Sequence, residues 1–451
     1  MKPVNGCALI GAARALSGIR DAVVLQHSVV GCHWGSLSIG MLQRSHDFRQ
    51  ASTVVYEENV IRGGTELIPK GLTNIKQLYP DVKVIFVISG CIPNMIGDDV
   101  QNAIDLWQKE NPGYTVLHVP APGYAGHEGD GMERAWLALL NLMKNKTVNK
   151  KSGRTEKPEK GISEKKTNKT ENENRNETVM EEIMEESSET ESGCGQLPKI
   201  NLLGITASDP YGINDLQYLR RIFSGKIKIG CALQQCTAEE ISHMGEADLN
   251  IVFGRGKKLA KSMEETFGTP YVCCDYPYGI QGIKDFLELL AEKLSVDFSD
   301  TISQIKTKAD RLVRNSAMYL TTLYQLPAAL VGDEAHRSGM KRFLQDELGM
   351  EIVIEEDSDT ADQNLLEQKV KDSNAVLLLA SSFQAELARR FSLPLVRYVY
   401  PVVDEVCLTQ QPMIGSEGTA WLIQQIVNVS LQMPYKTDGA YGGLRKTGYE
   451  S

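Results

Sequence analysis

Short runs of apolar residues alternate along most of the chain with longer segments in which apolar side chains recur at helical spacing. The short runs are typical of strands and fall into three groups: 21–28, 83–90 and 114–121; then 199–206, 227–233, 249–254 and 270–276; then 327–334, 349–356, 374–381 and 394–402. Helical spacing is clearest at 8–16, 98–110, 131–145, 283–294 and 418–433. Apolar strands separated by amphipathic helices indicate parallel sheets that are covered by helices on both faces. The pattern therefore predicts an α/β fold with three Rossmann-like subdomains.

Residues 145–196 break this alternation. The first half of the segment is rich in lysine, the second half is rich in glutamate, and sizeable apolar side chains are rare. Such a stretch cannot bury enough apolar surface to offset the entropy of ordering, so we predict a charged flexible insertion, either a simple tether or a docking tail. The predicted division is a first subdomain at 1–144 and a second at 197–298 on either side of the insertion, followed by a third at 299–451.

Composition narrows the class of protein. The chain has 451 residues, 42% of them hydrophobic, and a net charge of −10, which argues against nucleic acid or an anionic membrane as a main partner. No apolar run reaches the roughly 18–20 residues that cross a bilayer, and Arg14 and Arg20 interrupt any signal peptide. We expect a cytoplasmic protein whose nine cysteines are reduced thiols or metal ligands rather than disulfides.

Three cysteines lie near the front of the chain, each at the edge of an apolar run and beside a glycine or an expected helix start. Cys32 and Cys91 each follow an expected strand, and Cys7 precedes an expected helix. Ligands gather beyond the carboxyl ends of parallel strands, and the positive end of a helix favours a thiolate. Three thiolates are one short of the set that usually holds an iron–sulfur cluster, so a cluster shared with a second chain is the natural completion. Small buried core cysteines are the simpler alternative, because no Cys-x-x-Cys pair marks a zinc or ferredoxin-type site.

Two further expectations concern the acidic pair Asp98-Asp99 and the glycines near these cysteines. We expect Asp98 to be the N-cap of the helix that follows it. We also expect backbone N–H groups near Gly31, Gly90 and Gly97 to donate hydrogen bonds that tune the potential of a bound cluster.

Several stretches of the first block together resemble the nitrogenase component 1 family. The shared elements are an early Cys-x-x-x-Gly-Ala, His27 five residues before Cys32, an acidic stretch ending in Gly63-Gly64, and a post-strand cysteine followed by Ile-Gly-Asp-Asp at 96–99. The intervals between the three cysteines most resemble those of the beta chain of the molybdenum–iron protein. Later parts of the chain also look like that family, so the resemblance covers most of the chain outside the insertion: 247–272, 328–344 and 394–428.

The resemblance implies that Cys7, Cys32 and Cys91 ligate an iron–sulfur cluster at the interface with an alpha-type subunit, as a [4Fe-4S] centre or an eight-iron P-cluster type. It further implies that the cluster takes electrons from an ATP-dependent iron-protein reductase and passes them to a substrate site mainly on the partner, in an α2β2 heterotetramer. The chain has no Gly-x-x-x-x-Gly-Lys-Ser/Thr loop of its own, in keeping with that division. Reduction of dinitrogen, of methylthio-alkanes and of tetrapyrroles all use this architecture, and the substrate stays open.

Two positions depart from the family pattern. Where the alpha chain has a cysteine that anchors the active-site metal cofactor, this chain has Gly254, so we expect that it does not hold that cofactor. Where the beta chain offers an extra serine near the cluster, the stretch 122–131 places His127, which is either a further candidate ligand or a simply solvated loop residue.

Two other classes of function stay open: a cofactor-assembly scaffold of the same fold, and a non-enzymatic redox or metal-binding module. The segment 254–258 follows an expected strand and could cradle an anion at a helix start, or simply form a solvated helix face. It lacks the third glycine of a dinucleotide fingerprint.

The remaining cysteines include two close pairs that could form a second metal site. Cys231 and Cys236 are five residues apart, which is not the helical spacing that brings side chains together. Cys273 and Cys274 are adjacent on an expected strand, so their side chains point to opposite faces and one of them belongs to the core. Two more cysteines carry no assignment: Cys194 and Cys407.

Overall fold

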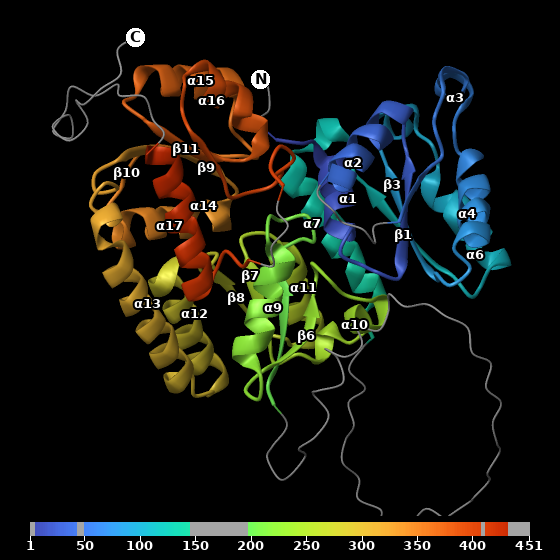
Figure 1. Cartoon of the computed structure of the whole chain (residues 1–451). Helices are drawn as coiled ribbons and strands as arrows, with labels where there is room; N and C mark the ends of the chain where they lie inside the picture. The colour runs from blue at the N-terminus through green and yellow to red at the C-terminus, as the bar shows by residue number, and fades with distance from the viewer. Residues whose placement is uncertain (1–4, 43–48, 145–196, 407–410, 432–451) are drawn as a thin grey trace, which may run out of the picture. The chain divides into compact units, whose positions relative to one another are not determined.

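The computed structural model describes most of the chain on both sides of the predicted insertion (Figure 1). The described residues are 5–42, 49–144, 197–406 and 411–431. The predicted insertion, together with Cys194 and Cys407, lies outside them. The residues before and after the insertion belong to one compact unit.

The first sheet has four parallel strands in the order β2-β1-β3-β4. These are β1 (Ala22–His27), β2 (Gln50–Ser52), β3 (Val84–Ser89) and β4 (Thr115–Pro120). The helices of this part are α1 (Ala8–Leu16), α2 (Val30–Leu42), α3 (Glu57–Arg62), α4 (Leu67–Leu78), α5 (Cys91–Ile96), α6 (Val100–Glu110) and α7 (Glu128–Ala138). Both faces of the sheet are buried: Val24 and Phe86 pack in one core with α1 and α7, while Val23 and Ile85 pack in another with α4 and α6.

The second sheet repeats the pattern with parallel strands in the order β6-β5-β7-β8. Its strands are β5 (Lys199–Leu203), β6 (Lys228–Ala232), β7 (Leu249–Phe253) and β8 (Tyr271–Cys274). Its helices are α9 (Gly212–Phe223), α10 (Ala238–Ser242), α11 (Lys257–Phe267) and α12 (Gly279–Leu294).

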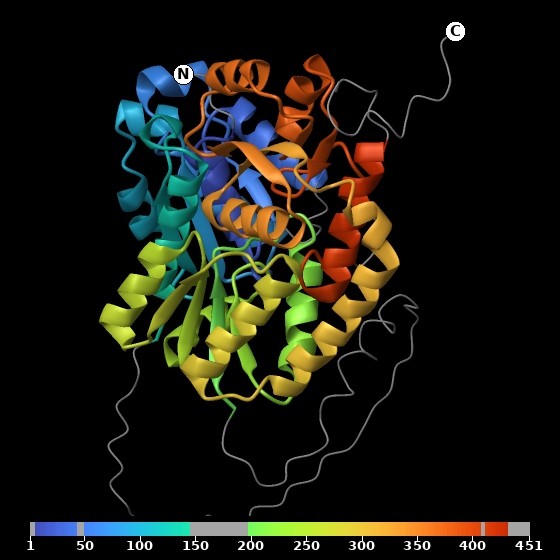
Figure 2. The same cartoon turned by 90° about the vertical axis from the view of Figure 1, so that its left-hand side faces the viewer.

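The third sheet has the order β10-β9-β11-β12, again with every pair parallel. Its strands are β9 (Pro327–Gly332), β10 (Glu351–Asp357), β11 (Leu377–Ala380) and β12 (Leu395–Arg397). Its helices are α13 (Ser299–Leu320), α14 (Glu334–Arg342), α15 (Gln363–Asp372), α16 (Ala385–Arg390) and α17 (Gly415–Leu431). Helix α17 packs against α12 and α13, and Figure 2 shows α13 and α17 running side by side.

The three sheets share one strand permutation, and this confirms the predicted α/β class with three Rossmann-like parts. Each predicted strand is present, and the additional strand is β2, which is short and only partly buried. The predicted bounds of the subdomains remain predictions. Among the described residues, no helix is both long and apolar enough to span a membrane.

Candidate functional site

The structure brings Cys7, Cys32 and Cys91 together at one corner of the first sheet. Cys7 is the N-cap of α1, Cys32 lies in the first turn of α2, and Cys91 is the first residue of α5. Each thiol therefore sits where the unpaired N–H groups of a helix create a positive potential that favours a thiolate. All three side chains are only partly buried, so a second chain could reach them. We call these three cysteines and Gly123 the cysteine corner.

Gly123 shows how close the sulfurs are. A Cβ atom added to this glycine would lie 3.3 Å from the Sγ atoms of both Cys7 and Cys91, so those sulfurs are at most twice that distance apart. The Gly123 N–H donates a hydrogen bond to the Cys91 Sγ at 3.0 Å. Hydrogen bonds to sulfur and an absent side chain are features that suit a bound iron–sulfur cluster.

The Cys32 thiol lies close enough to the other two to interact with them electrostatically. Burial raises the pKa of the Cys32 thiol, and the neighbouring Cys7 and Cys91 raise it further. Like charges that close together disfavour ionisation unless a cation compensates them. Within the described part of the chain, no group of three or more His, Cys, Asp or Glu side chains is arranged to hold a single metal ion.

His127 lies beside this corner through its backbone. It forms an isolated antiparallel bridge with Cys7 and is the N-cap residue of α7. Its N–H donates to the Asp130 carboxylate at 2.9 Å. The bridge fixes the segment that carries Cys7, which gives His127 a structural role whether or not its imidazole is a ligand.

One expectation about the residues around Cys91 was wrong. The N-cap of α6 is Asp99, whose side chain accepts the Asn102 N–H, while Asp98 turns inward and bonds to His27 instead. The Gly90 N–H itself donates to the His27 carbonyl at 3.0 Å, and the tuning of a bound cluster by N–H groups near Gly31, Gly90 and Gly97 stays a prediction. The N–H group that donates to the Cys91 sulfur belongs to Gly123. This role was not predicted, although Gly123 lies in the stretch 122–131.

A second cluster of functional groups lies at the carboxyl ends of strands from all three sheets. The Arg14 guanidinium pairs with Glu128 at 2.8 Å and with Asp209, and it stacks over the Tyr400 ring at 3.6 Å. Burial disfavours its charge, but the Asp209 and Glu128 carboxylates more than offset this and raise the pKa of Arg14. We call the paired charges here the central junction, made of Arg14, Glu128, Asp209, Arg255 and Asp359.

The expected anion cradle at 254–258 is filled by the chain itself. The N–H groups of Gly256, Lys257 and Lys258 donate to the Glu133 carboxylate at 2.6, 3.2 and 3.2 Å. This carboxylate takes the place that an external anion would occupy at the start of α11. The segment is therefore an internal cap and not an open ligand site.

Gly254 cannot readily be replaced by a side chain. Its φ is +69°, and an added Cβ would lie 2.8 Å from the Cβ of Ala335. The backbone conformation and the close neighbour both oppose a cysteine at this position. The structure thus gives a physical reason for glycine where the alpha chain is expected to have a cofactor cysteine.

The remaining cysteines split into a buried pair and a strand pair. Cys231 and Cys236 are both buried, and they lie close enough for Cys231 to raise the pKa of the Cys236 thiol. The expectation from helical spacing was wrong here, because Cys231 is in β6 and a turn brings Cys236 back to it. In β8, Cys273 is exposed and Cys274 packs against the core, as the alternation of side chains along a strand predicts.

Comparison with known proteins agrees with this architecture. The nitrogenase vanadium-iron protein beta chain of Trichormus variabilis is 24% identical, over 97% of this chain and 96% of the relative. The nitrogenase iron-molybdenum cofactor biosynthesis protein NifE of Clostridium pasteurianum is 29% identical over 299 residues, which is 64% of this chain and about half (54%) of that protein. Among solved structures, nitrogenase Cp1 at pH 6.5 has the same fold, with a TM-score of 0.75 at 18% identity over 96% of this chain and 93% of that chain.

Three parallel sheets that place clustered cysteines at one corner define a nitrogenase-like fold. The model of the nitrogenase component 1 type oxidoreductase family matches residues 7–431. The chain belongs to this family, and the resemblance stated from the sequence is confirmed.

Proposed function

We propose that this chain is the beta-type subunit of a nitrogenase-like reductase and that Cys7, Cys32 and Cys91 hold an iron–sulfur cluster shared with an alpha-type partner. The observation that carries the proposal is the close approach of the Cys7 and Cys91 sulfurs to Gly123, whose N–H donates to the Cys91 sulfur, with Cys32 near both thiols. Family membership implies metal–sulfur chemistry in general. The assignment to these three residues is our own inference.

In this proposal the chain's residues bind a cluster and tune its potential, and they do not themselves react. The three thiolates are ligands, and the helix ends that carry them lower the cost of their negative charge. The Gly123 N–H stabilises electron density on the Cys91 sulfur and so raises the tendency of a bound cluster to accept an electron. The cluster, once bound, supplies one-electron transfer from an ATP-dependent iron-protein reductase to the substrate site.

Exposed apolar side chains on the same elements support a partner at this corner. Val30 and Trp34 are on α2, Met95 is on α5, and Tyr124 follows Gly123; their exposed fractions are 56%, 66%, 69% and 62%. Large exposed apolar groups on the elements that carry a half-open site are typical of a protein interface. They fit an alpha-type subunit that completes the ligand set.

The central junction supports placing the substrate mainly on the partner. Ligands of doubly wound sheets gather beyond the carboxyl ends of the strands. In this chain that region holds buried ion pairs centred on Arg14. Because those charges satisfy one another, the crevice is not prepared for a substrate.

The similarity to NifE favours a second candidate, a cofactor-assembly scaffold. The same cluster site would then hold the subunits of a scaffold together instead of relaying electrons to a substrate. The two candidates differ in turnover. When reductase and MgATP are supplied, a relay cluster cycles between oxidation states and a reduced product is released, whereas a scaffold releases no reduced product.

Electron transfer into the complex tests the proposal. We expect the complex co-purified with its alpha-type partner to show a reductase- and MgATP-dependent change in its EPR spectrum, which Cys91→Ala abolishes while the fold is kept. Cys273→Ala is the matched control, because this exposed thiol lies on β8 and should leave the signal unchanged. An unaltered signal in Cys91→Ala would remove the central role of that thiolate.

A further inference from the structure

His27 is a buried hub that touches both segments carrying Cys32 and Cys91. It ends β1, five residues before Cys32, and its side chain is fully buried. Its carbonyl accepts the N–H of Gly90, the residue before Cys91, at 3.0 Å. Its Nδ1 lies 2.8 Å from the Thr53 hydroxyl. One residue therefore joins the ends of β1 and β3 just where the two cysteine segments begin.

Asp98 fixes this hub from the other side. Its Oδ2 is 3.0 Å from the His27 Nε2, and its Oδ1 accepts the Gly64 N–H at 2.8 Å. The Thr65 hydroxyl lies 3.3 Å from the same Oδ1. Because a carboxylate only accepts, the imidazole Nε2 must carry the proton, which leaves Nδ1 to accept from the Thr53 hydroxyl.

The fit around this carboxylate leaves no spare room. A Cβ added to Gly64 would lie 2.9 Å from the Asp98 Oδ2 and 3.3 Å from the His27 Cε1. The Asp98 side chain is only 2% exposed, so both N–H donors depend on it rather than on water. One network thus joins three elements that carry the family resemblance at separate places in the sequence: His27, Gly63-Gly64 and 96–99.

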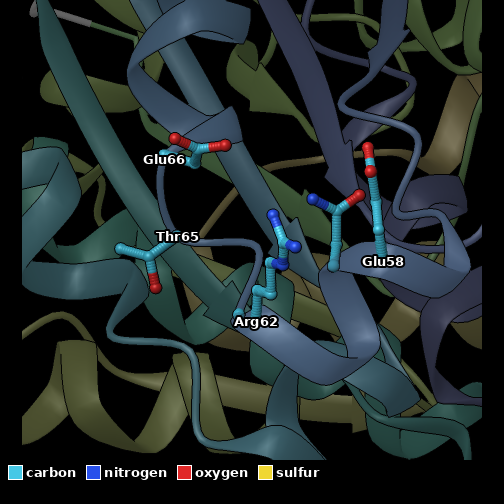
Figure 3. Close-up of a pocket in the computed structure, with 6 residues that line it drawn as sticks. Glu58, Arg62, Thr65 and Glu66 are labelled. Atoms are coloured by element: carbon cyan, nitrogen blue, oxygen red, sulfur yellow. The ribbon is translucent and has the colours of Figure 1, made fainter.

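The far end of the network lies at the surface. Gly63 and Thr65 line a pocket, and Figure 3 shows Arg62 between Glu66 and Glu58 along its wall. Thr65 also accepts the Asp99 N–H at 3.2 Å, so the pocket wall and the segment after Cys91 are tied together. The network therefore reaches from a surface pocket to the loops of the cysteine corner.

We propose that Asp98 is a positioning residue that holds the Cys32 and Cys91 segments at a fixed spacing by bridging His27 and Gly64. It touches no sulfur, and it acts through the hub. Cys7 is outside its control, because the Cys7 segment is held by the His127 bridge and by the Gly6 N–H bonded to Glu128 at 3.1 Å. The relevance to a cluster rests on the proposed function, whereas the mechanical role does not.

Hydrogen exchange on the full-length chain tests the mechanical role without a cluster. In Asp98→Ala, two buried donors lose their acceptor, so we expect exchange at 28–34 and 90–97 to rise about tenfold or more, with 8–16 unchanged. Asp99→Ala is the matched control: it also loses a carboxylate, but one that only caps α6. We expect Asp98→Asn to restore protection, because its amide can accept from Gly64 and donate to His27.

The iron-loaded complex gives the second readout. We expect Asp98→Ala to shift the midpoint potential and the EPR line shape of the cluster, and Asp98→Asn and Asp99→Ala to keep the wild-type values. Unchanged exchange in Asp98→Ala, or an equal effect of Asp99→Ala, would overturn the positioning role. A wild-type complex that contains no iron would instead contradict the proposed function and leave the exchange result standing.

Discussion

The cysteine corner and the central junction both lie at the carboxyl ends of parallel strands, yet they are built in opposite ways. In the central junction Arg14 is 5% exposed and Glu128 is fully buried, and each charge is paired with an opposite one. In the cysteine corner the thiols are partly exposed, a glycine leaves space between two of them, and an N–H is aimed at a sulfur. The first region is closed by its own paired side chains, whereas the thiols of the second stay partly exposed.

The difference shows that one strand topology can hold a structural region and a candidate chemical site at separate places. Buried ion pairs contribute little net stability but make the loss of one partner costly, so the junction fixes how the sheets meet. The open corner depends on that fixed frame, because Glu128 also accepts the Gly6 N–H beside Cys7. The central junction, whose charges pair with one another, thus supports the cysteine corner.

Removing the charge of Arg14 should have the largest effect on stability. Arg14→Met leaves Glu128 and Asp209 buried without a counter-charge, and we expect a loss of about 3–5 kcal/mol in the free energy of unfolding. Denaturant unfolding of the purified chain measures it. The exposed pair of Arg221 and Glu417 is the control, and Arg221→Met should cost less than about 1 kcal/mol. Equal losses in the two variants would show that the junction does not fix the frame.

Filling the space between the sulfurs should damage the corner without damaging the fold. Gly123→Ala places a methyl group 3.3 Å from the sulfurs of Cys7 and Cys91, so we expect most of the iron to be lost from the complex. Gly31→Ala, next to Cys32, is the matched control because nothing lies within 4 Å of its Cβ. Iron analysis with circular dichroism measures both effects. Full iron content in Gly123→Ala would show that the space is not part of the site.

The pH dependence of stability should come from the buried pair next to the junction. Burial disfavours the charged imidazole of His336, but Asp333 at 3.0 Å offsets this and raises the pKa of His336 above its usual 6.5. The stabilisation is complete below that value and is lost as the pH rises through the raised pKa. We therefore expect the difference in melting temperature between the wild type and His336→Gln to shrink as the pH rises from about 6 to about 9. A difference that grows over this range would reverse the sign of the argument.

The smallest effect is expected at His127. Its bridge to Cys7 and its bond to Asp130 use backbone groups, which His127→Ala keeps. We expect unchanged iron content in the complex, measured beside the wild type. A loss of iron would make the imidazole a ligand and enlarge the cysteine corner.

The strands were predictable because each contains a short apolar run, most clearly in β1 and β3, which are buried on both faces. Strand β2 was missed because Gln50–Ser52 is short and polar and pairs through its backbone alone. Helix α2 was not predicted either, because helical spacing of apolar residues is not clear in that segment.

The clustering of the three cysteines was predictable from their places after strands and before a helix, but the groups around them were not. Gly123 acts through space and an N–H, which leave no side-chain signal. Arg14 pairs with Glu128 and Asp209, which lie 114 and 195 residues further along the chain. No local sequence pattern therefore indicates these ion pairs. Asp98 and Asp99 are neighbours with the same side chain, and only the distant His27 decides which one caps the helix.

Iron and acid-labile sulfide per chain, measured on the anaerobically co-purified complex, test the central claim most directly. The account predicts about two irons per chain for one [4Fe-4S] cluster shared by two chains, or about four for an eight-iron cluster, with matching sulfide. It also predicts that both are lost when Cys7, Cys32 and Cys91 are replaced by alanine. A wild-type complex without iron, or a triple variant that keeps its iron, would contradict the account.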